Sequence, residues 1–176
     1  MKSVLISTQP KWCELIASGE KTIEVRRARP KIETPFKCYI YETKARSDMP
    51  TFVDEDGHVI FKGRGQVIGE FVCDCITDIK PFGFDDIVEF EKQTCLTSAD
   101  IVKYLNGFYG YGWHISDLKI YDKPRELSEF RKSGFMTEEE WLSNLYPNTH
   151  CHYEAWAKKF EITRPPQSYM CVEELS

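Results

Sequence analysis

The chain has 176 residues, 41% hydrophobic and 14% aromatic, which is long and apolar enough for one domain over 1–176 with a substantial core. Its net charge of −5 argues against a general high-affinity binder of duplex nucleic acid, because such affinity comes from neutralising many phosphates, but it permits a ligand of one or a few nucleotides. Seven cysteines without the spacing of a small secreted protein, and no signal-like or membrane-length apolar run, lead us to expect reduced thiols in a cytoplasmic protein without membrane contact.

The first half of the chain predicts mainly strands, with one early helix. Gly19 can take the left-handed conformation that ends a helix, so the apolar segment before it is predicted as a helix over 10–18. The alternating, β-branched segments predict strands, and a turn signal over 54–57 predicts a hairpin between 51–53 and 58–61. The other strands are expected at 3–7, 21–27, 37–43 and 66–79.

The second half of the chain predicts helices mixed with strands. A helix is expected over 98–105, capped by Thr97 or Ser98, with Gly107 just past its end. Another begins at Thr137, because acids fill its first turn. The remaining expectations are a strand at 114–121, a turn or short helix over 124–130 and a last strand over 167–172.

The segment from Lys21 to Arg26 is the most informative part of the chain. On a strand, Glu24 and Arg26 share one face, while Lys21 lies at the start of the strand. We therefore expect three charged side chains presented together to solvent. Two plainer interpretations stay open: a solvated salt-bridge ladder that contributes little, or an internal salt bridge that holds the fold together.

Several segments together resemble ASCH domains, part of the PUA-like superfamily. The most specific is Gly19-x-Lys21-x-x-Glu24-x-Arg26 after a short strand and a helix; the others are 3–7, 38–44, 65–71 and 113–124. The resemblance implies an α+β fold: a small PUA-like β-barrel with flanking helices, insertions at 45–64 and 125–165, and a cleft lined by the signature charges. It also implies RNA or a nucleotide-like small molecule as the partner.

The residue types in this hypothetical cleft suit nucleotide recognition. Arg26 offers a planar fork of donors for a phosphate or carbonyl edge, and Glu24 can accept from an exocyclic amine. Trp113 or Tyr109 could stack on a base. Lys21, if partly desolvated, could act as a base or nucleophile. Further ligand-binding candidates, chosen because their strands should neighbour the signature strand, are Tyr41, Lys44 and Ser168.

Three functional classes remain open at this stage. The first is a reader of RNA or modified nucleotides that does no chemistry. The second is a hydrolase: Lys21 and Glu24 could form the acid/base pair of a ribonuclease. The resemblance also allows an N4-acetylcytidine amidohydrolase, but Glu24 stands where that branch has a threonine, and only Glu91 is available as its distant glutamate. The third is a protein-interaction scaffold.

Three further features of the sequence bear on possible ligands. Cys73 and Cys75, expected on one strand face, and His150-Cys151-His152 lack the ligand spacing of a zinc site, so we expect neither a metal nor another cofactor. The glycine- and aromatic-rich run 107–112 could stack on a base or form a lid over the core. Positive charge is locally dense from Lys21 to Lys31, as on the rim of an anion site.

Overall fold

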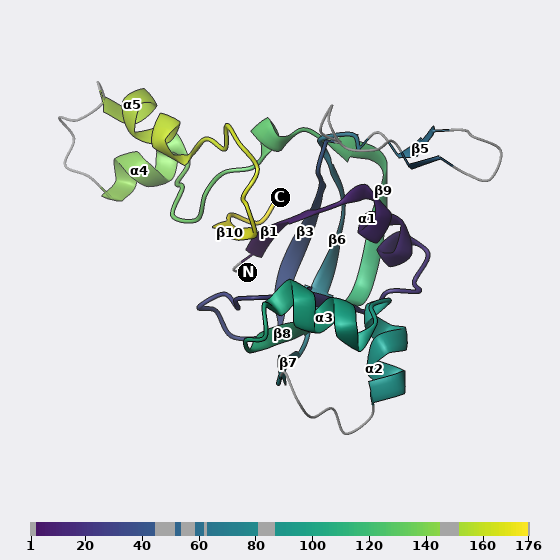
Figure 1. The fold of residues 1–176 in the computed structure, drawn as a ribbon. Helices are drawn as coiled ribbons and strands as arrows, with labels where there is room; N and C mark the ends of the chain where they lie inside the picture. Colours follow the sequence, from purple (N-terminus) through teal and green to yellow (C-terminus); the bar gives the residue numbers. More distant parts are fainter. Residues whose placement is uncertain are drawn as a thin grey trace.

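Two β-sheets that share one core form the body of the protein (Figure 1). The structure is a computed structural model that describes residues 3–44, 52–53, 59–61, 63–80, 87–144 and 152–175. The larger sheet has five strands in the order β10-β1-β3-β6-β9, in which β1 and β3 are parallel and the other pairs antiparallel. Its strands are β1 (Ser3–Thr8), β3 (Phe36–Glu42), β6 (Val67–Cys73), β9 (Ser116–Arg125) and β10 (Tyr169–Val172).

The smaller sheet has three strands and carries the signature strand at one edge. Its order is β2-β8-β7, formed by β2 (Ile23–Arg26), β8 (Gly110–His114) and β7 (Ile76–Ile79). A separate two-stranded ribbon, β4 (Phe52–Val53) with β5 (Val59–Phe61), agrees with the predicted hairpin, whose turn lies outside the described residues. The strands form separate sheets and do not close into a barrel, so the architecture is α+β, and the expected closed barrel is not found.

Helices cover the sheets and project from them (Figure 1). Helix α1 (Pro10–Ala17) contributes Cys13 and Ile16 to the core shared by both sheets. Helix α3 (Ser98–Leu105) packs Ile101 and Leu105 onto Val25 and Ile79 of the smaller sheet, and α2 (Ile87–Thr94) precedes it. Helices α4 (Glu138–Asn144) and α5 (Tyr153–Ala157) project from the body, packed through Trp141 and Trp156. Single 3₁₀ turns occupy Leu127–Glu129 and Lys158–Phe160. Across the described residues, no helix has the length and hydropathy that crossing a bilayer requires.

The largest departure from the predicted elements lies at 66–79. The expected long strand is two strands, because the chain breaks at Asp74 and Cys75, both exposed, and β7 joins the smaller sheet while β6 stays in the larger one. Cys73 is buried and Cys75 exposed, so they do not share a strand face. No cluster of metal-ligating side chains occurs within the described ranges, and His150 and Cys151 fall outside them.

Candidate functional site

The turn between α1 and β2 places the signature charges. Gly19 has φ +79°, the left-handed conformation expected of it, and its amide donates to the carbonyl of Ile16. The amide of Lys21 then donates to the carbonyl of Leu15 at 2.8 Å, so the chain turns back under the helix before β2 begins. A helix stop followed directly by a strand therefore fixes where Lys21 and Glu24 emerge.

Glu24 lies between two cations. Its Oε2 is 3.5 Å from Nζ of Lys21, and its Oε1 is 3.0 Å from Nη2 of Arg26. Lys21 is 2% exposed, Glu24 7% and Arg26 4%. The three signature charges are thus brought together as predicted, but they are buried instead of being presented to solvent. The expectation of an open charged face is wrong.

Lys21 joins the signature turn to the end of α2. Its ammonium group donates to the carbonyls of Ile23 at 2.9 Å and Thr94 at 2.7 Å, in addition to its ion pair with Glu24. An ammonium group has three donors, and here all three have partners. An amine nucleophile needs a lone pair directed at its substrate, so this geometry does not favour that role for Lys21.

Arg26 joins three segments that are distant in sequence. Its Nη1 donates to the carbonyl of Ser168 at 3.1 Å, and its Nη2 donates to the carbonyl of Ser7 at 2.9 Å and to Oγ1 of Thr8 at 3.2 Å. Its Nε is buried and has no hydrogen-bond partner. Of the buried signature groups, only this nitrogen lacks an acceptor among the described residues.

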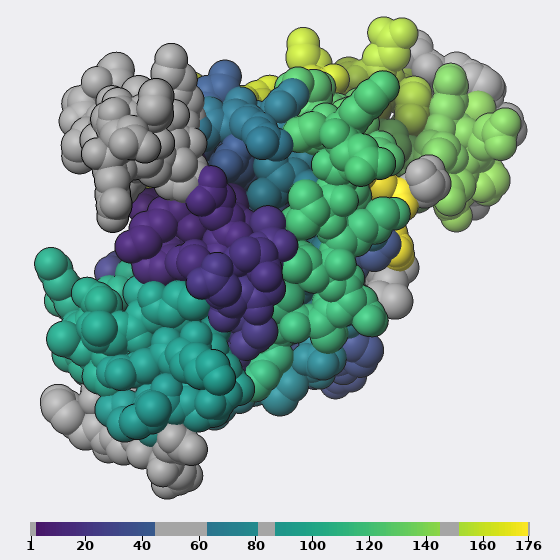
Figure 2. Space-filling model, turned by 90° about the vertical axis from the view of Figure 1, so that its right-hand side faces the viewer, coloured from purple at the N-terminus to yellow at the C-terminus, as the bar shows by residue number. Residues whose placement is uncertain are grey.

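Strand β2 is buried because both of its faces are covered. Val25 packs beneath α3, while the opposite face of β2, with Glu24 and Arg26, is turned toward the end of β1. In Figure 2 the purple N-terminal segment lies directly above the teal segment that contains α2 and α3. The end of α2 contacts the start of β2 there, since the carbonyl of Thr94 accepts from Lys21. Alternation along a strand shows which residues share a face, but not whether a second layer covers it.

Trp113 stands opposite Glu24 in the β2–β8 register. It is fully buried, with its ring edge-on to Phe36 at 5.6 Å between centroids and tilted against Tyr169 at 5.6 Å. Stacking on a base is therefore unavailable to its ring, which corrects that expectation. Its indole Nε1, like Arg26 Nε, is buried without a hydrogen-bond partner.

The three further ligand-binding candidates, Tyr41, Lys44 and Ser168, lie in different places. Ser168 reaches the site through its main chain, because its carbonyl accepts from Arg26. Tyr41 lies on the other face of β3, in a cluster with Phe130, so it does not join the signature charges. Lys44 is exposed, with its aliphatic stem packed over Gly65.

Glu42 and Cys13 belong to this neighbourhood although they were not among the predicted site residues. Glu42 is buried at the end of β3, opposite Thr8 of β1, and accepts from the amide of Arg64 at 2.8 Å. Burial, and then the charges of Glu42 and Glu24, raise the pKa of the Cys13 thiol far above its usual range. Both carboxylates therefore lie near Cys13. The two-residue alternation along β3 could have identified Glu42 from the sequence, because Cys38, Ile40 and Glu42 share the inner face of that strand.

The comparison with known families agrees with this architecture. The model of the ASCH domain matches residues 6–165. The chain belongs to the ASCH domain family. No curated protein sequence is a match.

Solved structures show the same fold in another ASCH domain. The crystal structure of ASCH from Zymomonas mobilis has a TM-score of 0.59 and 19% identity, over 98% of this chain and 89% of that chain. Its serine-to-alanine variant has a TM-score of 0.58 and 17% identity over 98% and 89%, and its tyrosine-to-phenylalanine variant 0.56 and 17% over 99% and 92%. At this identity the likeness concerns the fold alone.

The remaining candidate for chemistry in this ASCH domain is Glu91. Its carboxylate accepts from the amide and hydroxyl of Ser98 at the start of α3, and these hydrogen bonds lower the pKa of Glu91. Glu91 is thus part of a helix cap and makes no contact with Lys21. Two hollows in the described surface also lie away from the signature: one is lined by Lys31–Glu33, Pro35 and Phe36, the other by parts of 126–131 and 161–163.

Proposed function

We propose that this ASCH domain binds RNA or a nucleotide-like ligand, and that Lys21, Glu24 and Arg26 form the part of the site that recognises the base or phosphate. Family membership supports the ligand class, and the buried network supports the location. Glu24 and Glu42 each keep a small exposed fraction, 7% and 8%, which places the network at the edge of the shared core and not at its centre.

One observation carries the proposal: the buried Nε of Arg26 has no acceptor. Most buried polar groups in proteins are hydrogen-bonded, and leaving one unsatisfied costs about 1–3 kcal/mol. The indole Nε1 of Trp113 is a second such donor, on the neighbouring strand. A carbonyl or phosphate oxygen of a nucleotide is the type of acceptor that satisfies a donor such as Arg26 Nε.

Binding without turnover is the better supported class. The three donors of Lys21 are occupied, and Glu24 is bound between two cations, so neither group is free to move a proton to a substrate. The hydroxyl used by the amidohydrolase branch is replaced by the Glu24 carboxylate, and Glu91 caps a helix instead of approaching Lys21. No contact among the described residues favours hydrolysis over recognition.

The experiment is a titration of the ¹⁵N-labelled protein with cytidine and uridine monophosphates and with a short single-stranded RNA. We expect a saturable shift of the Arg26 Nε–H signal, because this donor acquires an acceptor, and a shift of the Trp113 Nε1–H signal, because its strand pairs with β2. The indole signal of Trp141, which packs with Tyr153 and Trp156 away from the site, serves as the internal control.

The outcomes separate the candidate functions. No shift of either donor at millimolar ligand overturns the proposal. Parallel incubation with N4-acetylcytidine and with RNA, analysed for products, tests turnover. Product formation that Lys21→Arg abolishes would replace the reader by a hydrolase.

A further inference from the structure

A second surface, separate from the buried network, lies where β2 ends and β8 begins. In the antiparallel register, Arg26 pairs with Tyr111, so the chain leaving β2 at Arg27 runs beside the chain that enters β8 at Gly110. We define the edge surface as the cations that follow β2 and the aromatic residues at the end of α3: Arg27, Arg29, Lys31, Tyr104, Phe108 and Tyr109.

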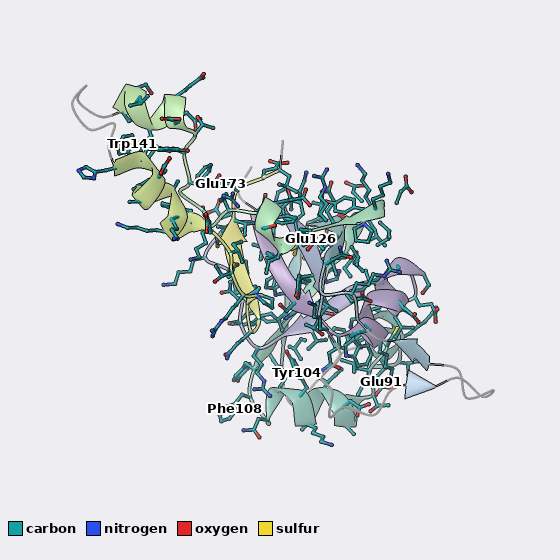
Figure 3. The ribbon with its side chains drawn as sticks, turned by 90° about the horizontal axis from the view of Figure 1, so that it is seen from above. Glu91, Tyr104, Phe108, Glu126, Trp141 and Glu173 are labelled. Atoms are coloured by element: carbon teal, nitrogen blue, oxygen red, sulfur yellow. The ribbon has the colours of Figure 1, made fainter. Side chains whose placement is uncertain are left out.

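The aromatic half of the edge surface is unusually exposed. Phe108 is 67% exposed and Tyr109 68%, and Tyr104 is also exposed. Within the described residues, every exposed large aromatic side chain lies in this short stretch. Figure 3 shows Tyr104 and Phe108 together at the end of α3, far from Trp141. The alternative of a lid over the core does not apply to Phe108 and Tyr109, because these rings face solvent.

The basic half of the edge surface is directly joined to the aromatic half. The Nε of Arg27 donates to the carbonyl of Tyr104 at 2.8 Å, and its guanidinium lies over the Tyr104 ring, 5.0 Å from the centroid. Arg29 and Lys31 are exposed. Guanidinium groups beside aromatic rings are the combination that proteins use to hold a single strand, with rings stacking on bases and cations meeting phosphates.

Among the described residues, no carboxylate neutralises the three cations of the edge surface. Throughout the described part of the chain, no carboxylate forms an ion pair with Arg27, Arg29 or Lys31, in contrast to Lys21, Arg26 and Lys37. The acids closest in sequence and in register, Glu33 and Asp78, make no such pair either. Locally positive charge on a chain of net charge −5 is complementary to a phosphate backbone.

The loop that carries these cations is held by its main chain. The hydroxyl of Tyr169 donates to the carbonyl of Arg29 at 2.8 Å, and Pro30 is buried. The side chains of Arg29 and Lys31 therefore extend from an anchored backbone, which lowers the ordering cost of binding. Beside Lys31 lies the hollow lined also by Ile32, Glu33, Pro35 and Phe36, which adjoins the surface.

We infer that the edge surface binds single-stranded RNA, with Phe108 and Tyr109 stacking on bases and Arg27, Arg29 and Lys31 contacting phosphates. This rests on the proposed function for the ligand class only, and uses none of the signature residues. Three phosphate contacts on a single strand predict that the logarithm of affinity falls with the logarithm of salt concentration with a slope of about −2. Between 50 and 200 mM salt this corresponds to a loss of about 20-fold.

The test is fluorescence anisotropy with a labelled 12-nucleotide uridine-rich RNA at several salt concentrations. Arg29→Gln and Lys31→Gln together should weaken binding at low salt and make the slope shallower by about 1.4, from two lost phosphate contacts. Phe108→Ala and Tyr109→Ala together should lower affinity at least tenfold while leaving the slope unchanged, because stacking involves no counterion release. The matched control is Lys119→Gln with Lys123→Gln, two exposed cations of β9 outside the surface; it should match the parent.

Each result decides between this inference and the proposed function. If the parent binds RNA and the edge variants bind as tightly, the inference is overturned while the signature site stands. If mononucleotides shift the Trp113 Nε1–H signal but the parent does not bind the 12-mer, the inference is likewise overturned and the signature site stands. RNA binding that depends on the edge, without any response of Arg26 Nε–H or Trp113 Nε1–H to mononucleotides, supports the edge and removes the signature site. If Phe108→Ala changes a dimer to a monomer and leaves RNA affinity unaltered, the surface is a contact between copies and the inference fails.

Discussion

Replacing Glu24 with glutamine should strongly destabilise the fold. The substitution keeps the size of the side chain but removes the negative charge between Lys21 and Arg26, which are 2% and 4% exposed. Removing one partner of a buried ion pair costs about 3–5 kcal/mol, since an uncompensated charge stays buried.

The neighbouring hydrogen bonds place the expected value at the lower end of that range. After the substitution, Lys21 keeps the carbonyls of Ile23 and Thr94, and Arg26 keeps its three oxygen acceptors from Ser7, Thr8 and Ser168. We therefore expect a loss of about 3 kcal/mol in the free energy of unfolding. For a chain of this length that corresponds to a decrease of about 6–12 °C in Tm.

The assay is urea unfolding at pH 7, with Tm from calorimetry. The matched control is Glu129→Gln, which removes a carboxylate 3.2 Å from Arg125 on the surface, where both side chains are more than 40% exposed. An exposed pair contributes about 0–1 kcal/mol, so this variant should unfold near the parent. If Glu24→Gln lost no more than Glu129→Gln, the buried network would not stabilise the fold, and the reasoning would be refuted.

Two further predictions concern titratable groups. Iodoacetamide at pH 8 should modify the exposed Cys75 long before Cys13, because burial and nearby carboxylates raise the pKa of the Cys13 thiol; equal rates of modification, measured by mass spectrometry, would contradict this. Hydrogen bonds from the amide and hydroxyl of Thr137 lower the pKa of Glu140 below 4.5 in the folded protein, so this cap stabilises α4 above that pH and the contribution is lost as the pH falls through the lower folded pKa. An NMR titration of Glu140 should therefore show a midpoint below 4.5 that rises in Thr137→Ala, and an unchanged midpoint in that variant would contradict the cap.

Sequence patterns located the signature strand but not its environment. The helix stop at Gly19 and the alternation after it predicted β2 and the meeting of Lys21, Glu24 and Arg26. They did not show that the face carrying Glu24 and Arg26 is covered from the larger sheet, because burial of a polar strand face depends on segments such as Ser7 and Ser168 that are far away in sequence.

The missed strand β8 has a different physical cause. The glycine- and aromatic-rich run 107–112 was not predicted as a strand, yet Gly110 and Gly112 both lie in one. A Cβ at Gly110 would lie 2.5 Å from a methyl carbon of Leu105, and one at Gly112 would lie 2.9 Å from a methyl carbon of Ile23. These glycines permit close packing instead of a turn, and single-sequence patterns do not separate the two uses.

The choice of Tyr41 over Glu42 was an error of parity on a correctly predicted strand. Tyr41 and Tyr39 pack on the outer face of β3 with Phe130, whereas Cys38 and Ile40 face the shared core. Counting from those inner residues places Glu42 on the side of the signature charges. This part of the site was therefore predictable from the sequence once the inner face of β3 was identified.

The buried network has a structural role that accounts for nearly all of its contacts. Lys21 and Arg26 donate to main-chain carbonyls of Ile23, Thr94, Ser168 and Ser7, so apolar substitutes would leave these acceptors without donors. Stability alone thus explains why both residues are cations and why Glu24 lies between them. It does not explain a guanidinium whose Nε is buried without an acceptor. The case for recognition at the signature depends on that one nitrogen, whereas the case for the edge surface depends on side chains that already face solvent.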